Sequence, residues 1–221
     1  MSHELPVYLI DDDESVRRSL RFMLESYGLT IHDFDSAEAF FAAIDLSEPG
    51  CALVDVRMPG LSGPQLHAQL VQHNSPLAVI YLTGHGDVPM AVEALKLGAV
   101  DFFQKPADGA KLADAVVKAL EHAKAHYQDN QYVNTYLALT PREREILSLI
   151  AKGYKNQEIA DTLCIAMRTV EIHRSNLMRG MQVGSLAEMI LIYSRIADRL
   201  PPHKTHLSWG ELAYPWPFDV S

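Results

Sequence analysis

Reactive side chains follow four short apolar runs of this chain. The run VYLI is followed by Asp11 and Asp12, and the run CALV is followed directly by Asp55. Thr83 ends the stretch LAVIYLT, and Lys105 comes shortly after the weaker run DFF. Carboxylates suit a metal cation, while a hydroxyl and an ammonium suit phosphoryl oxygens. If the runs are strands of one sheet, these side chains could hold a metal ion and a phosphoryl group, with Asp55 free to attack phosphorus.

The segments that must position these residues alternate between strand and helix patterns. Short, almost wholly apolar runs are typical of strands buried on both faces, and segments with apolar residues at helical spacing separate them. The expected strands cover 7–10, 30–34, 51–56, 77–82 and 101–104, and the expected helices cover 16–27, 36–44, 64–72, 88–97 and 108–126. This alternation predicts an α/β fold, a flavodoxin-like five-stranded parallel sheet with helices on both faces.

Three aspartates should converge in this fold. Ligands of open parallel sheets bind beyond the carboxyl ends of the strands, where Asp11, Asp12 and Asp55 would lie together. Like charges at short range repel, so we expect a cation among them, and several hard oxygen ligands favour Mg²⁺. Aspartates after a strand are also common as plain turn residues or helix caps, and Asp13 is expected to be such a cap.

Two other ligand sites fit these residues less well. An EF-hand loop needs a glycine at its sixth position and a glutamate at its twelfth, and the acidic run at 11–13 is followed by neither at these spacings. An FMN site in a flavodoxin-type fold would need a phosphate loop of Ser, Thr or Gly after the first strand. The acidic residues found there would repel phosphate instead.

The back of the chain differs in charge and in pattern. Residues 1–122 hold 18 Asp and Glu against 8 Lys and Arg, whereas residues 140–200 hold 7 against 9, so only the back could favour nucleic acid. Four short helices are expected there, and the middle two form a helix–turn–helix. They are TPREREILSLIAKG, NQEIADTL, RTVEIHRSNLMRGM and SLAEMILIYSRIADRL, with Thr140, Asn156 and Ser185 as N-caps. The third could read DNA in the major groove, or the helices could form a plain bundle with a solvated polar face.

We therefore divide the chain into four segments. They are a first domain at 1–122, a linker at 123–139 where the last front helix frays at Asn130, an all-α four-helix domain at 140–200, and a tail at 201–221. Large aromatic side chains are costly to leave in water, so the tail is expected to dock on the protein or on a partner. Its aromatic residues are Trp209, Tyr214, Trp216 and Phe218.

The composition, 48% hydrophobic and 21% charged, is that of a globular protein. No run reaches the ~20 apolar residues of a membrane span, and the N-terminus lacks the basic start and long apolar core of a signal peptide. Cys51 and Cys164 lie among apolar residues, so both are expected to be reduced core cysteines. These features predict a cytoplasmic protein.

The front motifs resemble a known family. LIDDDES, LVDVRMPGLSG, TGHGD and DFFQKP, in this order over residues 5–122, are similar to the response-regulator receiver domain, and TGHGDVPMAVEALKLGAVDFFQKP resembles its FixJ subgroup. The resemblance implies that Asp55 accepts a phosphoryl group from a phosphohistidine of a sensor histidine kinase. It implies Asp12, Asp55 and the backbone carbonyl of Arg57 as Mg²⁺ ligands, with Asp11 acting mainly through water.

The same resemblance assigns Thr83 and Lys105 to the phosphoryl oxygens and Phe102 to the aromatic residue that switches together with Thr83. It also implies a cis Lys105–Pro106 bond. His85 is expected to be a solvent-exposed loop histidine rather than a residue for dephosphorylation. Apart from accepting a phosphoryl group on itself, the protein is not expected to be an enzyme.

The back half resembles the LuxR/NarL-type DNA-binding domain over residues 138–199. His173 and Asn176 match its signature, although His173 is expected to serve packing or a phosphate rather than a base. Glu171 can accept from cytosine N4 and repels phosphate, so it should restrict sequence more than it adds affinity. Ala166 stands where a capping Ser is usual and Gly180 where a Lys is usual, and both should weaken the helix or its phosphate contacts. The expected DNA-binding residues are Arg168, Thr169, Glu171, Ile172, His173, Arg174, Ser175 and Asn176.

One small helix–turn–helix offers few phosphate contacts, so two copies on adjacent half-sites should bind more tightly. The FixJ-like resemblance implies a homodimer on phosphorylation, and we expect Val92, Lys96 and Asp101 on its contact face. The expected partners are a sensor histidine kinase, double-stranded promoter DNA, a second copy of the chain and RNA polymerase, with no membrane.

Two other functions remain open at this stage. Haloacid-dehalogenase phosphatases also use an aspartyl nucleophile on an α/β sheet, but they carry a D-x-D-x-T pattern, whereas VRM follows Asp55 here. A ligand-sensing transcription factor of the quorum type could carry the same DNA-binding half. The acidic cluster argues against it, and small-molecule binding would favour it.

Overall fold

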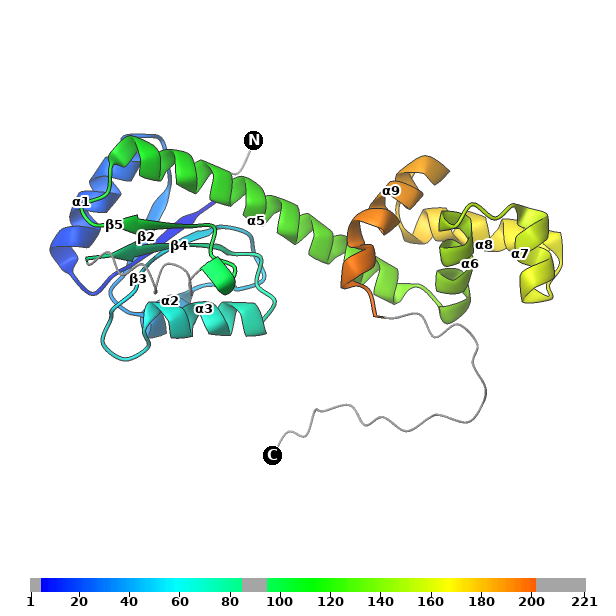
Figure 1. Cartoon of the computed structure of the whole chain (residues 1–221), viewed down its shortest axis with the longest axis horizontal. Coiled ribbons are helices and arrows are strands. Elements are labelled where there is room, and N and C mark those ends of the chain that lie inside the picture. Colours follow the sequence, from blue (N-terminus) through cyan, green and yellow to red (C-terminus); the bar gives the residue numbers. More distant parts are fainter. Residues whose placement is uncertain (1–4, 85–94, 202–221) are drawn as a thin grey trace, which may run out of the picture. The chain divides into compact units, whose positions relative to one another are not determined.

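The computed structural model describes residues 5–84 and 95–201. The chain forms two compact units, Met1–Asn134 and Thr135–Ser221. The helix α5, Gly109–Ala138, has residues in both units. Figure 1 shows the sheet and its helices in the first unit and the short helices in the second.

The first unit is built on a parallel sheet of five strands. The strands are β1 (Val7–Ile10), β2 (Ile31–Phe34), β3 (Cys51–Asp55), β4 (Ala78–Thr83) and β5 (Asp101–Gln104). Their order is β2-β1-β3-β4-β5, and every neighbouring pair is parallel. The flavodoxin-like fold is therefore confirmed. Because β1 and β3 are neighbours in register, with Ile10 opposite Val54, their carboxyl ends lie at the same edge of the sheet.

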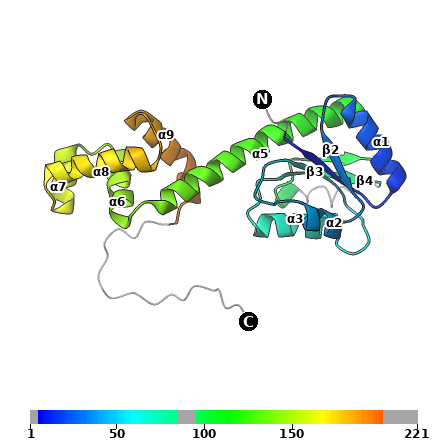
Figure 2. The same ribbon diagram turned by 180° about the vertical axis from the view of Figure 1, so that it is seen from behind.

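Helices cover both faces of this sheet. Besides α5 they are α1 (Glu14–Glu25), α2 (Ala37–Ala43) and α3 (Gly63–Gln72). α1 and α5 lie on one face and α2 and α3 on the other, as the two opposite views show (Figures 1 and 2). Most of the helix expected at 88–97 lies outside the described residues.

Alternation along each strand sends side chains to two separate hydrophobic cores. Leu9 and Leu53 pack with Leu24 of α1 and Val116 of α5 in one core. The other core joins the opposite strand faces to α2 and α3; it includes Tyr8, Ile10, Val54, Tyr81, Phe40, Leu66 and Leu70. Because helices cover both faces, the central strands β1, β3 and β4 are buried throughout and apolar at nearly every position, which is the pattern that revealed them in the sequence.

The second unit contains the short helices of the back half. They are α6 (Pro141–Ala151), α7 (Asn156–Leu163), α8 (Met167–Gly180) and α9 (Leu186–Ile196), followed by the 3₁₀ helix η1 (Ala197–Arg199). Thr140 and Ser185 are N-caps as expected, accepting hydrogen bonds from the backbone N–H groups of Glu143 and Glu188. Buried side chains of all four α-helices form the core; they include Ile146, Ile159, Val170, Leu177, Met189 and Ile196.

Two local expectations are wrong. α5 does not fray at Asn130 but continues to Ala138, because residues 123–138 lack Gly and Pro and are buried at Ala123 and at Tyr136. The N-cap of α7 is Lys155 rather than Asn156, because the backbone N–H of Lys155 donates to Glu158. The tail beyond residue 201 lies outside the described residues.

Cys164 is also misplaced by the sequence reading. Cys51 is buried as expected, but Cys164 is exposed. It ends α7 in the left-handed conformation, with φ of 52°, so the turn toward α8 carries it to the surface despite its apolar neighbours. Burial of Cys51 raises the pKa of its thiol, which keeps that side chain neutral.

Candidate functional site

The carboxyl ends of the central strands meet at one polar cavity. Asp11 follows β1, Asp55 ends β3, Thr83 ends β4, and Lys105 follows β5. The cavity has a volume of about 370 Å³ and is lined by Asp11, Asp12, Asp13, Val16, Asp55, Arg57, Thr83, Gly84 and Lys105. The structure thus brings together side chains that are up to 94 positions apart in the sequence.

Lys105 is the centre of this cluster. Its Nζ donates to Oδ2 of Asp11 and, at 2.7 Å, to Oδ1 of Asp55. The two carboxylates are almost fully buried, Asp11 at 1% and Asp55 at 7% exposure, so the ammonium is their charge partner inside the protein. Two buried carboxylates without such a partner would be costly.

Burial and charge compete in setting the pKa values of the cluster. Burial raises the pKa of Asp11 above its ordinary value, and the hydrogen bond and charge of Lys105 only partly offset this effect. Burial alone would lower the pKa of Lys105, but the hydrogen bonds and charges of Asp11 and Asp55 together outweigh it, so its pKa is raised. Lys105 is therefore a permanently charged ammonium at neutral pH.

Backbone groups fix the orientation of both carboxylates. The N–H of Asp13 donates to Oδ1 of Asp11, and the N–H of Arg57 donates to Oδ2 of Asp55, each at 3.0 Å. Asp13 is the N-cap of α1, as expected, and accepts from the N–H groups of Ser15 and Val16. One oxygen of Asp11 and one of Asp55 are thus held by the main chain, and the other oxygen of each by Lys105.

The sequence reading missed two residues that support the site. A Cβ at Gly63 would lie 2.4 Å from the carbonyl oxygen of Asp55, so only glycine allows α3 to begin this close to β3. Arg17 donates through Nη1 to the carbonyl oxygen of Asp11 at 2.7 Å. Gly63 stands in the quoted motif LVDVRMPGLSG and could have been noticed there, whereas nothing in the spacing of Arg17 indicates its partner.

A metal ion is expected in this cavity, and its side chains offer oxygen donors. Asp12 is exposed, and no three His, Cys, Asp or Glu side chains of the described residues are grouped closely enough to share a metal ion. Asp12 is thus more accessible to solvent than Asp11 and Asp55, which share the ammonium of Lys105. The carboxylates of Asp11, Asp12 and Asp55 nevertheless line one cavity with Arg57. Such hard oxygen donors fit Mg²⁺ better than a softer ion.

The remaining residues of the front half lie beside this cavity or outside the described part. Phe102 is partly buried and packs against the core that contains Tyr81. The Lys105–Pro106 bond is cis, as expected. His85 and Val92 lie outside the described residues. Lys96 is exposed, and Asp101 is partly buried, with Oδ1 accepting from the N–H of Phe102 at 2.8 Å.

The second candidate site is the outer face of α8. Val170 and Leu177 are buried, while Arg168, Ile172 and Ser175 are exposed. The other predicted DNA-binding residues are partly buried; they are Thr169, Glu171, His173, Arg174 and Asn176. Helical periodicity explains this division, because the buried residues pack against α6 and α7. The N-cap Ala166 makes no side-chain hydrogen bond, as its residue type predicts.

Two basic residues of α8 already have partners within the protein. Nη1 of Arg168 donates to Glu171 at 2.9 Å, and both side chains are accessible to solvent. Nη1 of Arg174 donates at 2.9 Å to Oδ1 of Asn156 in α7, so Arg174 joins two helices rather than pointing freely outward. The buried Nδ1 of His173 has no hydrogen-bond partner in the described part of the chain, which agrees with a packing role.

The two halves match two family models. Residues 7–117 match the response regulator receiver domain, and residues 137–193 match the bacterial regulatory proteins of the luxR family. This chain belongs to the response regulators. As a two-component response regulator with a helix–turn–helix domain, it has a kinase as a partner and binds DNA. Receiver domains generally use Mg²⁺ for phosphorylation.

Individual relatives agree with this assignment. The response regulator is 46% identical to the tetrathionate response regulatory protein TtrR of Salmonella typhimurium over 192 residues, which cover 87% of this chain and 93% of the relative. It is 44% identical to the transcriptional regulatory protein FixJ of Azorhizobium caulinodans, with coverage of 86% and 92%.

Solved structures of similar proteins support the same fold. The response regulator StyR has 37% identity and a TM-score of 0.65, with 87% of this chain and 99% of that chain covered. Full-length FixJ from B. japonicum has 39% identity and a TM-score of 0.54, with coverage of 90% and 99%. No helix among residues 5–84 and 95–201 is long and apolar enough to cross a membrane.

Proposed function

We propose that this response regulator accepts a phosphoryl group on Asp55 from a sensor histidine kinase and, once phosphorylated, binds promoter DNA as a dimer. One observation carries the proposal: Asp55 ends the central strand β3, lines the polar cavity, and lies 2.7 Å from the ammonium of Lys105. Asp11 is the other acidic group bonded to Lys105, but it is more deeply buried. Asp55 is therefore the better placed nucleophile.

The residues around Asp55 suit this transfer. An oxygen of Asp55 attacks phosphorus, the P–N bond to the kinase histidine breaks, and the electron pair returns to the imidazole nitrogen. Lys105 offsets the charge of the phosphoryl oxygens, and the hydroxyl of the nearly buried Thr83 lies in the same cavity. Mg²⁺, when bound, would add positive charge at the phosphoryl oxygens, with Asp11, Asp12, Asp55 and the carbonyl of Arg57 as its candidate ligands.

The decisive experiment is labelling with a small acyl phosphate. Asp55→Asn should abolish incorporation of the phosphoryl group, because the amide cannot attack phosphorus, while circular dichroism shows a folded protein. Asp13→Asn is the matched control: Asp13 lines the same cavity but caps α1, so this variant should retain labelling. Undiminished labelling of Asp55→Asn would exclude the assignment. Labelling should also stop in a chelator and resume when Mg²⁺ is added.

Dimerisation is proposed for the phosphorylated state. The face built from Val92, Lys96 and Asp101 would form the contact, since an apolar residue with two opposite charges suits a two-fold interface. Analytical ultracentrifugation should show one chain without phosphorylation and two chains with a beryllofluoride mimic. Val92→Asp should remain monomeric in both conditions. A parent protein that stays monomeric with the mimic would contradict this face and this switch.

The remaining assignments follow from the same proposal. The protein would act in the cytoplasm, where promoter DNA and RNA polymerase are available to it. Phosphoryl acceptance would be a single event on its own side chain, so no turnover of a small-molecule phosphoester is expected. Release of phosphate from a small phosphoester at a steady rate would contradict that view.

A further inference from the structure

A pair of histidines on α5 is not used by the function proposed above. His122 and His126 are the two histidines of this helix and lie four positions apart. On an α-helix that spacing places side chains one above the other on the same face, with about 5–6 Å between their Cβ atoms. His122 is exposed and His126 is partly buried, so solvent reaches the pair.

The pair opens into a cavity of the first unit. This cavity has a volume of about 240 Å³, and His67 of α3 also lines it together with Asn74, Ser75 and Pro76. None of its lining residues is Asp, Glu, Lys or Arg. It lies beside residues that precede β4, such as Pro76 and Leu77, whereas the Asp55 cavity lies at the opposite, carboxyl edge of the sheet.

The candidate metal ligands of this cavity are imidazole nitrogens, whereas those of the Asp55 cavity are carboxylate oxygens. Imidazole nitrogens favour Zn²⁺, Cu²⁺ and Ni²⁺, whereas Mg²⁺ prefers oxygen ligands. Two histidines four residues apart on one helix face are a known arrangement for holding zinc. The third histidine, His67, is buried, and burial lowers its pKa, so this ring stays neutral; its Nδ1 lies 3.1 Å from the hydroxyl of Tyr81.

We propose that His122 and His126 form a binding site for a transition-metal dication such as Zn²⁺. No three metal-binding side chains of the described residues are grouped around one point, so the protein contributes two ligands and water completes the shell. A bound ion would bridge one turn of α5. Ala123, between the two histidines, is the last α5 residue in the core of the first unit. The ion would therefore brace α5 beside its last residue in that core.

The test is titration of the full chain with ZnSO₄ by isothermal calorimetry, with excess Mg²⁺ present to occupy oxygen sites. The parent is expected to bind one more Zn²⁺ than the variant with both His122→Ala and His126→Ala. Counting the difference matters because the chain also contains other histidines, including His3, His203 and His206. Zn²⁺ should raise the thermal unfolding temperature of the parent more than that of the double variant.

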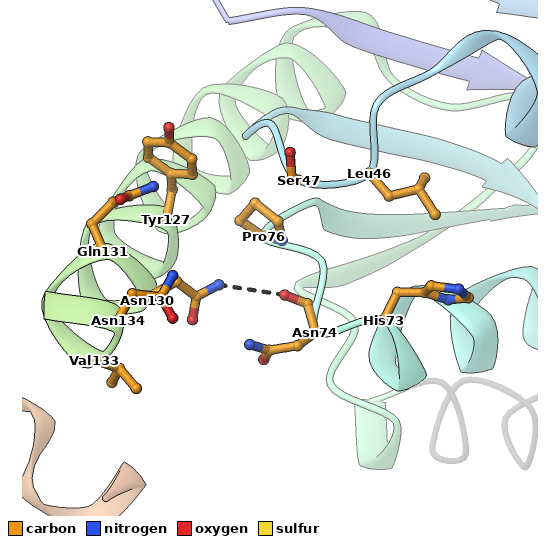
Figure 3. A pocket seen from close by; sticks show the side chains of 10 residues that line it. All are labelled: Leu46, Ser47, His73, Asn74, Pro76, Tyr127, Asn130, Gln131, Val133 and Asn134. Carbon is orange, nitrogen blue, oxygen red and sulfur yellow. Dashed lines mark hydrogen bonds between the residues drawn. The ribbon is translucent and has the colours of Figure 1, made fainter. Parts of the chain in front are cut away.

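Two controls separate a metal site from a general loss of histidines. His73→Ala should bind Zn²⁺ as the parent does, because Nδ1 of His73 is bonded to the carbonyl of Gln69 at 2.8 Å. His73 belongs to the neighbouring cavity, where Asn130 donates to Asn74 across the gap (Figure 3). The second control combines His126→Ala with Lys124→His, which keeps the number of histidines but places them two residues apart, on different faces of the helix.

The results decide between clear outcomes. Loss of one Zn²⁺ in the double variant and in the respaced variant, but not in His73→Ala, supports the site. Equal binding by the parent and the double variant overturns it. Equal binding by the parent and the respaced variant also overturns it, because the helix spacing would then be irrelevant. An Asp55→Asn variant should retain this Zn²⁺, so failure of this inference and failure of the proposed function are distinguishable.

Discussion

The two candidate sites of this response regulator place their charges in opposite ways. In the Asp55 cavity, Asp11, Asp55 and Lys105 come from three strand ends, and each side chain is at least four-fifths buried. On α8, Arg168 and Glu171 are neighbours on one helix, and the Arg168 side chain is 82% exposed. Burial makes an interaction between charges strong and makes the loss of one partner costly, while solvent screens an exposed pair. The first site is therefore a coupled cluster and the second a set of weak, separable contacts.

The largest expected effect is that of Lys105→Met. It leaves two buried carboxylates without their cation and should lower the free energy of unfolding by about 3–5 kcal/mol at pH 7. The matched substitution on the exposed pair, Arg168→Met, should change it by less than about 1 kcal/mol. Urea denaturation of both variants measures the two changes in the free energy of unfolding. Equal effects would show that burial is not what distinguishes the two sites.

The pH dependence of the stability difference between the parent and Lys105→Met tests the direction of the pKa shift of Lys105. The pKa of Lys105 is raised in the folded protein, so its stabilising contribution is present below 10.5, its unfolded value, and is lost as pH rises through the folded value. The difference in stability between parent and Lys105→Met should therefore shrink above pH 10.5. A constant difference from pH 7 to pH 12 would contradict the charge interaction.

A smaller effect is expected at the N-terminus of α6. Thr140 and Glu143 form a capping box on the surface, so Thr140→Ala should cost about 1 kcal/mol. Hydrogen bonds from Thr140 lower the pKa of Glu143, so their contribution is present above pH 4.5 and is lost as pH falls through the folded value. Denaturation at pH 7 and pH 3 should show the difference between parent and variant shrinking at the lower pH. Thr140→Ser, which keeps the hydroxyl, is the control.

Arg174→Ala should affect both protein packing and DNA binding. Arg174 is bonded to Asn156, so its removal affects the packing of α7 on α8 as well as any phosphate contact. Asn156→Ala breaks the same hydrogen bond but keeps the charge. If Arg174 contacts phosphate, only Arg174→Ala should change the salt dependence of binding. The slope of log affinity against log salt concentration should become shallower by about 0.9. Equal salt slopes for both variants would assign Arg174 a structural role.

The smallest effect on stability is expected for Glu171→Ala. It removes a negative charge from the outer face of α8 and frees Arg168, so binding to random DNA should hold or tighten while sequence preference relaxes. Fluorescence anisotropy with target and random duplexes measures both. Unchanged affinity for both duplexes would exclude Glu171 from the reading face.

Most of the fold was predictable because its local signals agree. Strands buried on both faces must be apolar throughout, and the caps Asp13, Thr140 and Ser185 have the residue types that their positions favour. The wrong predictions concern residues whose role depends on a hydrogen-bond partner or on the local backbone conformation rather than on residue type. Asn156 is the first residue of α7 rather than its N-cap because Lys155 forms the capping box with Glu158, and Cys164 is exposed because a left-handed turn overrides its apolar neighbours.

The sequence by itself determined which residues stand at the strand ends, since the short apolar runs and the order of the motifs leave little choice for Asp11, Asp55, Thr83 and Lys105. Only the tertiary structure decided how these groups meet. It turned Asp12 to the surface, set Lys105 between Asp11 and Asp55, and brought α3 against β3 at Gly63. The reason is physical: residue types follow local rules of burial and capping, whereas the contacts of a buried charge depend on side chains that are distant in the sequence.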